Sequence, residues 1–363
     1  MDANKFQIDL DREYKEFCKN TSKPNILLIG GTGVGKSSLI NVCFGEELAS
    51  FGIGKPITQH IQSYSCDTIP VVLYDSKGYE IGSEKEREFI RDVLDYIKKS
   101  VDRAAIHMVW YCIQASGARI VDFDVSITNQ LRQAGLPVAI VVTKADLFSE
   151  DESSKFSHEI ERLLPSVPVF ETTIRSSLKN LQVSSLCEWA VNNLPHGLRT
   201  AFIAGQRVNI RIKRDKAKDV IAQHSSMSAF VGFTPIPFSD APLLLANQAG
   251  MIARILYIYN LESLKSNLST ILSGSAIGTL ISQSGIWLVG QIMKLLPGIG
   301  TLIGGAINGT VAAAITYAVG MAVSELCAQF SEAVLEGNTD NLNQFIENMP
   351  ALFSEELLKN FHK

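Results

Sequence analysis

One short segment limits the folds open to this chain of 363 residues more than any other. It is the glycine-rich stretch Gly30-Gly31-Thr32-Gly33-Val34-Gly35-Lys36-Ser37, which follows an apolar run and matches the pattern G-x-x-x-x-G-K-[ST] in full. An apolar strand before this pattern and a helix after it are the context in which it forms a loop around phosphate groups. We therefore expect a phosphate-binding loop in an α/β domain.

Each residue type in this loop has a chemical role. Glycines let successive backbone N–H groups point inward, and the helix N-terminus adds partial positive charge. The Lys36 ammonium reaches the β- and γ-phosphates, which makes it a candidate catalytic residue, and the Ser37 hydroxyl is a hard oxygen ligand for Mg²⁺. The predicted nucleotide-binding residues of the segment are Gly31, Thr32, Gly33, Val34, Gly35, Lys36, Ser37 and Ser38.

Continuous apolar runs alternate with helical patterns through the first half of the chain. The runs cover residues 25–29, 71–74, 105–113, 138–142 and 167–170. Strands that are apolar on both faces indicate a parallel sheet covered by helices on each side. The expected fold class is α/β, a three-layer, mostly parallel sheet of the P-loop NTPase type, followed by an all-α hydrophobic domain.

A second motif, Asp75-Ser76-Lys77-Gly78, follows the run 71–74 and resembles the D-x-x-G motif of GTPases. In that role Asp75 would hold Mg²⁺, and the N–H of Gly78 would contact the γ-phosphate and detect its loss. The first switch should lie between the loop helix and this strand, where Thr58 is the candidate hydroxyl that closes on Mg²⁺. The predicted metal ligands are thus Ser37, Thr58 and Asp75, with Thr58 and Gly78 also assigned to catalysis.

A third motif, Thr143-Lys144-Ala145-Asp146, follows the run 138–142 and resembles the [NT]-K-x-D guanine motif. The Asp146 carboxylate can accept hydrogen bonds from N1–H and N2–H₂ of guanine, a donor pair that adenine lacks. The alkyl stem of Lys144 would cover the base. Thr143 replaces the commoner Asn, so we expect it to hold the phosphate loop less well. Thr172 and Thr173 are weaker candidates for a loop that closes on the base.

With these motifs in order, residues 24–195 resemble the Era-like branch of translation-factor-related GTPases. The Gly-Val-Gly-Lys-Ser-Ser form also looks like septins, chloroplast-import GTPases and immunity-related GTPases. The whole chain is similar to a bacterial-type family in which such a domain precedes a hydrophobic helical domain, a likeness carried by residues 231–237, 250–253 and 296–300. The resemblance implies GTP or GDP and Mg²⁺ as ligands.

Two departures from these relatives concern hydrolysis. Tyr79 follows Gly78 where Ras-type enzymes carry a water-positioning Gln, and Gly33 stands where potassium-activated relatives carry Asn. We therefore expect slow turnover that needs a partner, or dimerisation of the GTP-binding domain, to supply missing groups. Arg119 is a candidate arginine finger, although a solvated arginine is the simpler interpretation.

The second half of the chain holds two long uncharged segments. Residues 266–293 and 298–324 contain no Asp, Glu, Lys or Arg, and each exceeds the roughly 20 residues that span a bilayer. Gly305 and Gly309 form a G-x-x-x-G pair that permits close helix contact. Gly, Ser and Thr dilute the hydrophobicity, however, so a membrane hairpin within 266–324 and a packed helical domain both remain open.

Composition further indicates which ligands, cellular location and domain organisation to expect. A net charge of −4 gives no general attraction to nucleic acid, and no nucleic-acid-binding module is seen; the basic stretch 207–218 is interpreted as a solvated helix. The six cysteines form no CxxC pair, which favours a reducing, cytoplasmic location, with membrane association as the open alternative. The expected organisation is an N-terminal helix (1–23), a GTP-binding domain (24–195), a linker helix (196–227), a hydrophobic helical domain (228–336) and a C-terminal amphipathic helix (337–363).

The sequence thus predicts a GTP-binding protein with slow, Mg²⁺-dependent hydrolysis that switches its C-terminal half for membrane association or partner assembly. Two alternatives use the same phosphate loop. One is an ATPase, and the other is a scaffold that binds GTP without hydrolysing it.

Overall fold

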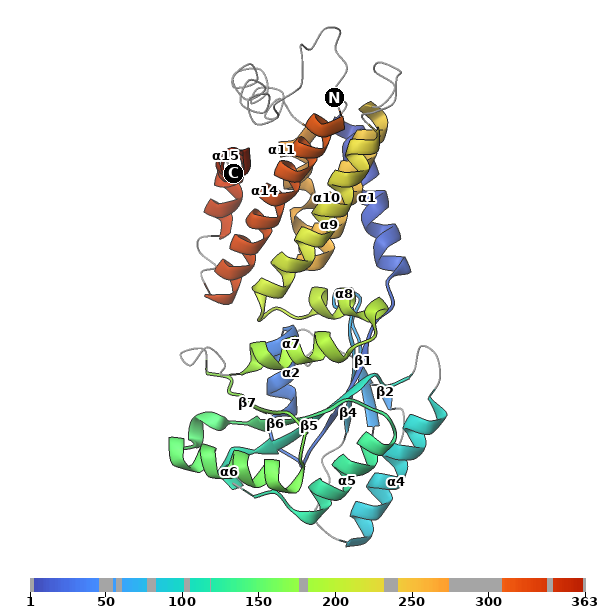
Figure 1. Cartoon of the computed structure of the whole chain (residues 1–363), viewed down its shortest axis with the longest axis vertical. Coiled ribbons are helices and arrows are strands. Elements are labelled where there is room, and N and C mark those ends of the chain that lie inside the picture. Colours follow the sequence, from blue (N-terminus) through green and yellow to red (C-terminus); the bar gives the residue numbers. More distant parts are fainter. Residues whose placement is uncertain are drawn as a thin grey trace. The chain divides into compact units, whose positions relative to one another are not determined.

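The structure, a computed structural model, divides the chain into two compact units. Residues 22–209 form one unit, and residues 1–21 together with 210–363 form the other (Figure 1). The structure describes residues 3–45, 55–56, 61–76, 83–100, 105–117, 119–175, 182–231, 241–273, 309–337 and 342–361.

Strands and helices alternate through the first unit, as the apolar runs predict. Its strands are β1 (Asn25–Ile29), β2 (Lys55–Pro56), β3 (Ile61–Tyr64), β4 (Val72–Ser76), β5 (Met108–Gln114), β6 (Val138–Thr143) and β7 (Val169–Glu171). Its helices are α2 (Lys36–Phe44), α4 (Ser83–Lys99), α5 (Asp122–Gln133), α6 (Glu150–Leu163), α7 (Val183–Asn193) and α8 (His196–Gly205), with short 3-10 turns at Ala115–Gly117 and Ala145–Leu147.

Within the described residues the strands form one seven-stranded sheet in the order β2-β3-β4-β1-β5-β6-β7. The pairs β4–β1, β1–β5, β5–β6 and β6–β7 are parallel, whereas β2–β3 and β3–β4 are antiparallel. The fold class predicted from the sequence is confirmed. The short strands β2 and β3 were not predicted, because they lie in a polar stretch without a continuous apolar run.

Each face of the sheet has its own hydrophobic core, because successive strand residues point to opposite faces. On one face, Ile26 and Leu28 of β1 pack with buried side chains of α2 and α7. On the other, Leu27 and Ile29 pack with buried side chains of α4, α5 and α6. Figure 1 shows these helices as layers above and below the sheet. All five residues of β1 are buried, and this central strand leads directly into the glycine-rich loop.

The second unit is helical. Its helices are α1 (Ala3–Asn20), α9 (Ile210–Val231), α10 (Ala241–Tyr259), α11 (Lys265–Ser273), α14 (Gly309–Leu335) and α15 (Leu342–Phe361), with a 3-10 turn at Glu262–Leu264. The expected linker helix over 196–227 is instead two helices, α8 and α9, which belong to different units. The helix expected over 337–363 is α15, which begins at Leu342 and contains Pro350 in its interior, where the missing proline N–H leaves one backbone carbonyl without its helical donor.

The N-terminal helix α1 packs with helices that lie more than two hundred residues later in the chain. Its apolar stripe, Phe6, Leu10 and Tyr14, is buried. Lys265 of α11 pairs with Asp11 at 2.9 Å, and its ammonium lies 4.8 Å from the centre of the Tyr14 ring. α1 is therefore part of the helical unit, and residues 22–209 are inserted between α1 and α9.

Helix α14 lies among α9, α10 and α15. Within the described residues it is the one helix long and apolar enough to cross a membrane, over Ala312–Leu335, by length and composition alone. Most of that stretch is buried inside the unit, as in the core helix of a soluble bundle. A Cβ added at Gly320 would lie 2.8 Å from Ile221 and 2.9 Å from Met251, so this glycine allows close packing with α9 and α10. Residues 274–308, including Gly305, lie outside the described residues.

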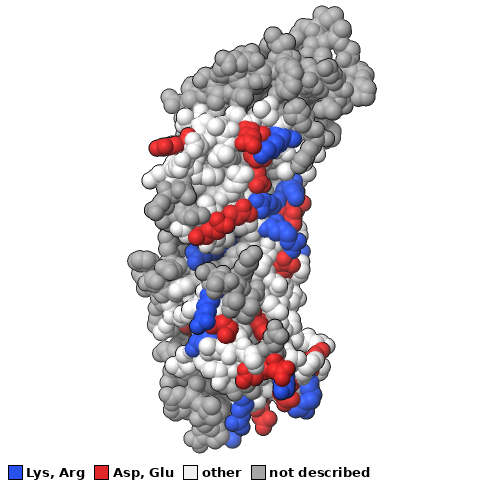
Figure 2. Space-filling view, turned by 90° about the vertical axis from the view of Figure 1, so that its left-hand side faces the viewer, with Lys and Arg blue, Asp and Glu red and all other residues white. Residues whose placement is uncertain are grey.

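Two cations of the basic stretch 207–218 have structural roles, so the interpretation as a solvated helix is wrong for them. Lys213 is buried and donates to the Ile258 carbonyl at 2.8 Å, near the C-terminus of α10. Arg214 pairs with Glu325 at 3.1 Å and with Glu332 at 2.8 Å, both on α14. On the face drawn in Figure 2, basic and acidic side chains are interspersed among the described residues.

A small polar layer joins α9, α10 and α14 within this apolar unit. The Asn247 amide donates to the His224 carbonyl and to the Ser228 hydroxyl, both at 2.8 Å, and Ser228 bonds Thr316. Since the Asn247 oxygen must accept, Nδ1 of His224 donates to it at 2.7 Å. Nε2 of His224 has no hydrogen-bond partner among the described residues. Burial lowers the pKa of His224, helped by nearby Arg254 and opposed by the Asn247 bond and Glu13.

We expect His224 to make the helical unit sensitive to acid. Because the pKa of His224 is lower in the folded chain than in the unfolded chain, the unfolded state binds more protons as the pH falls through about 6.5, and stability is lost. Replacing His224 with Gln keeps a donor for Asn247 and removes this titration. The melting temperature of the variant should therefore fall less between pH 7 and pH 5 than that of the wild type, measured by circular dichroism.

The matched control is His196→Gln, since His196 is exposed at the start of α8. Its melting temperature should follow the wild type at each pH. Equal acid sensitivity of wild type and His224→Gln would contradict the prediction.

Candidate functional site

The glycine-rich loop connects the end of β1 to the start of α2, and two of its positions favour glycine for different reasons. A Cβ at Gly30 would lie 2.4 Å from the Cys112 carbonyl oxygen of β5. Gly35 has φ +107° and caps α2, a conformation that residues with a Cβ rarely adopt. The loop is therefore held against β5 while the N-terminus of α2 faces outward from the end of the sheet.

Lys36 lies inside the curve of the loop and is 7% exposed. Its ammonium donates to the carbonyls of Gly30 at 2.9 Å and Gly31 at 3.2 Å, and it lies 3.9 Å from Oδ1 of Asp75. The next residue, Ser37, is exposed. The structure thus brings together the predicted phosphate ligand and the predicted carboxylate from β4.

Asp75 fits the role of a metal carboxylate. Burial raises the pKa of Asp75 to about 6, while Lys36 opposes the rise. Its Oδ1 atom is buried and accepts no hydrogen bond among the described residues. A buried carboxylate oxygen without a donor is costly unless a cation or its bound water fills the place. Asp75 and the exposed hydroxyl of Ser37 are therefore suited to hold Mg²⁺, which prefers oxygen ligands.

The Thr143-Lys144 pair fastens the end of β6 to the phosphate loop. The Thr143 hydroxyl donates to the Val34 carbonyl and also lies 3.3 Å from the Ile113 carbonyl. Lys144 has φ +54°, and its ammonium donates to the Gly33 carbonyl and to the side-chain oxygen of Gln114, both at 3.0 Å. Thr143 thus reaches the loop despite replacing Asn, and Gln114 is a support that no sequence motif indicated.

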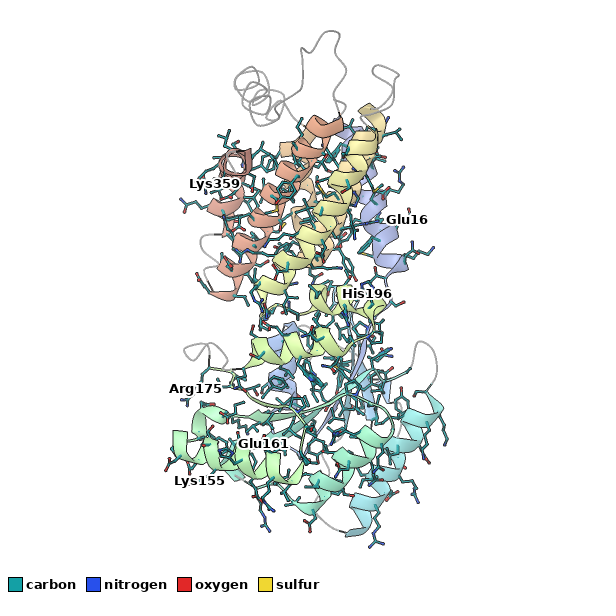
Figure 3. All side chains as sticks on the ribbon, viewed as in Figure 1. Glu16, Lys155, Glu161, Arg175, His196 and Lys359 are labelled. Carbon is teal, nitrogen blue, oxygen red and sulfur yellow. The ribbon has the colours of Figure 1, made fainter. Side chains whose placement is uncertain are left out.

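Asp146 is held by the loop after β7. Its Oδ1 accepts from the Thr173 hydroxyl at 2.6 Å, and its Oδ2 lies 3.0 Å from Nε of Arg175, which Figure 3 labels. The backbone of Thr172 pairs with Val142 and Ala145, which places this loop beside the end of β6. A cavity there is lined by Gly35, Ser38, Leu39, Val42, Thr143, Lys144, Thr172, Thr173 and Ile174. The phosphate loop with α2, the end of β6 and the loop after β7 therefore meet at one cavity.

Other predicted residues stand apart from this cluster. Thr58, Gly78 and Tyr79 lie outside the described residues. Arg119 is exposed just before α5. Arg175 was not predicted from the sequence, because a single arginine after a strand belongs to no motif. Its position two residues after Thr173, in the loop expected to close on the base, was the one indication of its role.

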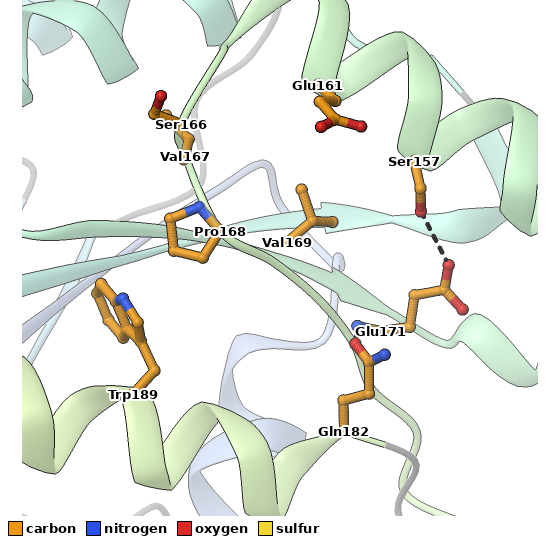
Figure 4. A pocket seen from close by; sticks show the side chains of 9 residues that line it. All are labelled: Ser157, Glu161, Ser166, Val167, Pro168, Val169, Glu171, Gln182 and Trp189. Atoms are coloured by element: carbon orange, nitrogen blue, oxygen red, sulfur yellow. Dashed lines mark hydrogen bonds between the residues drawn. The ribbon is translucent and has the colours of Figure 1, made fainter.

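A second, larger cavity of about 500 Å³ lies at the edge of the sheet, between α6, β7 and α7 (Figure 4). It contains none of the residues assigned to nucleotide binding. Trp189 and Pro168 lie on one side, and the Ser157 hydroxyl donates to Glu171 at 3.1 Å on the other. Gln182 covers the edge of β7 at Glu171. Its side-chain oxygen accepts from the N–H of Glu171, and its backbone N–H donates to the carbonyl of Glu171, so another strand cannot pair at that residue.

Two family models match the chain. Residues 25–144 match the model described as 50S ribosome-binding GTPase. Residues 199–353 match the model of a domain of unknown function (DUF697).

Curated relatives and solved structures match the first unit. GTPase Era of Ruminiclostridium cellulolyticum is 26% identical over 181 residues, 47% of this chain and 55% of that protein. The probable GTP-binding protein EngB of Aquifex aeolicus is 27% identical over 142 residues, 38% of this chain and 75% of that protein. A structure of Era with MgGDPNP and a segment of 16S ribosomal RNA is 19% identical, covers 55% of this chain and 68% of that one, and has a TM-score of 0.36. The chain therefore spans about half the length of the Era relative.

The sheet order, the loop after β1 and the cluster around Asp146 define the first unit as a P-loop domain of the GTPase class. More specifically, this unit is similar to the GTPases Era and EngB, and residues 199–353 match the DUF697 model.

We expect Arg175 to compete with guanine for Asp146. Each oxygen of Asp146 already has one partner in this structure, so Arg175 occupies part of the carboxylate edge that guanine would use. Arg175 is 63% exposed, so its ion pair is worth about 0.2–1 kcal/mol. Arg175→Ala should therefore raise the affinity for guanine nucleotide by roughly two- to five-fold, as measured by titration with a fluorescent GDP analogue.

The matched control is Arg162→Ala, because Arg162 is an exposed arginine on α6 that pairs with Glu159. It should leave the affinity unchanged. Weaker binding by Arg175→Ala would instead indicate that Arg175 contacts the nucleotide.

Proposed function

We propose that this chain binds GTP with Mg²⁺, hydrolyses it slowly, and uses the nucleotide state to control its helical unit. The observation that carries the proposal is that Thr143 and Lys144 bind the phosphate loop, while Thr173, which lines the same cavity, bonds Asp146. Because Thr143 and Lys144 bind the loop directly, Asp146 is fixed relative to the site for phosphate. A guanine nucleotide could then engage Asp146 and the loop at once.

The reaction follows from the groups present. A water oxygen attacks the γ-phosphorus, the bond to the β–γ bridging oxygen breaks, and GDP and inorganic phosphate result. Lys36 and the N–H groups of the loop stabilise the negative charge that shifts onto the phosphate oxygens. Mg²⁺ would neutralise further charge on those oxygens when held by Ser37 and Asp75, and we propose Thr58 as a third ligand. The N–H of Gly78 is proposed to report the γ-phosphate.

Slow turnover is part of this proposal. Tyr79 stands where Ras-type enzymes carry a water-positioning Gln, and Gly33 stands where potassium-activated GTPases carry Asn. Arg119 is exposed, and we propose it as a candidate arginine finger for a nucleotide held by another copy of the domain. We therefore propose that a partner or a second copy supplies the missing groups, as in other GTPases that need a stimulating protein.

Asp146→Asn tests the choice of base. An amide offers a donor where the carboxylate accepts, so the variant should lose about 1–3 kcal/mol of GTP binding, or roughly 5- to 150-fold in affinity. Xanthosine triphosphate, whose ring carries a carbonyl at that edge, should bind the variant better than GTP. Competition binding with GTP, xanthosine triphosphate and ATP measures this, with Asp151→Asn as an exposed control on α6. Equal affinity of the wild type for ATP and GTP would support an ATPase instead.

The helical unit is proposed to act through partner proteins in the cytoplasm, with α14 staying in the bundle. Glu325 and Glu332 of α14 pair with Arg214 of α9, and Ser324 bonds Tyr259 of α10. Moving α14 into lipid would break these pairs and transfer charged groups into hydrocarbon, which costs several kcal/mol. Membrane association through residues 266–324, the range left open by the sequence, is the alternative.

Membrane flotation distinguishes action through partner proteins from membrane association. The full chain, loaded with GDP or with a non-hydrolysable GTP analogue, should stay with the soluble fraction in both states when mixed with lipid vesicles. Binding to vesicles only with the GTP analogue would support nucleotide-controlled membrane association. Carbonate-resistant binding in both states would overturn the view that the unit acts through soluble partners.

A further inference from the structure

The C-terminus of the phosphate-loop helix is closed by a residue from much later in the chain. A helix leaves its last four carbonyls without helical partners, which in α2 are those of residues 41–44. The Asn41 carbonyl accepts from the N–H of Gly45 at 3.0 Å. The Cys43 carbonyl accepts from the backbone N–H of Arg207 at 2.9 Å, and the Val42 carbonyl from Nε of Arg207 at 3.3 Å. One residue therefore supplies two of these bonds, with a cation at the negative end of the helix dipole.

The segment around Arg207 is fixed to the same domain on other sides. A Cβ at Gly205 would lie 2.7 Å from Val71, which directly precedes β4, the strand that carries Asp75. Gln206 and Asn209 are buried and bond each other through the Gln206 side chain at 2.8 Å and 3.0 Å. The Asn209 amide also donates to Glu188 of α7 at 3.1 Å. We call residues 205–209 the bracing segment.

The bracing segment touches the two elements that lead to the nucleotide site. α2 begins at Lys36 and ends at Phe44, beside Arg207, and the chain then continues toward Thr58. The bracing segment also contacts Val71, just before the start of β4, through Gly205. After Asn209 the chain passes without interruption into α9, the helix that carries Lys213, Arg214 and His224 of the helical unit.

We propose that Arg207 is a positioning residue that couples the phosphate-loop helix to α9. The inference rests on the proposed function, because it needs a nucleotide to change α2. When phosphate binds at the N-terminus of α2, any shift or tightening of that helix reaches its last turn, because the helix is a rigid hydrogen-bonded rod. Arg207 holds that turn by two bonds, so the start of α9 is biased by the nucleotide state. By reciprocity, a partner that holds α9 would change nucleotide affinity.

The test uses hydrogen exchange of the first turns of α9, residues 210–220, in the full chain. Exchange is compared without nucleotide, with GDP and with a non-hydrolysable GTP analogue. Arg207→Ala removes the guanidinium bond and leaves the backbone bond. Arg207→Pro removes both donors, and the preceding Gln206, with φ −74° and ψ 146°, already has a conformation that a following proline favours. The matched control is Arg199→Ala, whose guanidinium donates to the Leu194 carbonyl at the end of α7.

In the wild type and in Arg199→Ala, we expect nucleotide to change exchange in α9. The change should be reduced in Arg207→Ala and lost in Arg207→Pro, while labelled GTP still binds and the melting temperature shows a folded chain. If wild-type α9 exchanges alike in all states despite bound GTP, or if both Arg207 variants respond as the wild type does, the coupling through Arg207 is overturned, while GTP binding and hydrolysis stand. If the wild type binds no labelled GTP, the proposed function and the coupling both fail.

Discussion

The first unit depends on the close approach of a glycine loop to a neighbouring strand. At Gly30 no side chain fits between the loop and the Cys112 carbonyl, and at Gly35 the chain turns into α2 with a positive φ. This course leaves N–H groups facing outward at a helix N-terminus, where an anion is favoured. The position of Lys36, the bonds from Thr143 and Lys144, and the place of Asp75 are all defined relative to this loop.

The sequence predicted strands and site residues best at positions where the backbone restricts which residue types fit. Every apolar run assigned as a strand in the first unit is a strand, because residues such as Leu27 and Leu28 face different cores and both must be apolar. The motif residues Lys36, Asp75, Thr143 and Asp146 are brought together because they follow or close neighbouring strands. Roles that depend on Thr58 and Gly78 remain predictions, since both lie outside the described residues.

Long-range contacts were beyond the reach of pattern reasoning. Nothing local distinguishes Arg175, Arg207 or Lys213 from solvated cations, and each acts through a partner far away in the sequence. The character of α14 was open for a similar reason. A helix that is apolar on every side must be buried, but composition does not say whether protein or lipid buries it. Its contacts with α9 and α10, and the lack of space beside Gly320, show that protein covers most of the described part of it.

The insertion of residues 22–209 between α1 and α9 has a consequence for how the chain is made. During synthesis α1 leaves the ribosome before residues 22–209, and the helices that bury Leu10 and Tyr14 follow only after that whole unit. Until then an amphipathic helix stays uncovered, open to chaperones or to wrong pairings. Once the inserted unit has folded, its compact body replaces a long loose loop, which lowers the entropy lost when α1 docks. Early folding of the first unit would therefore promote assembly of the second.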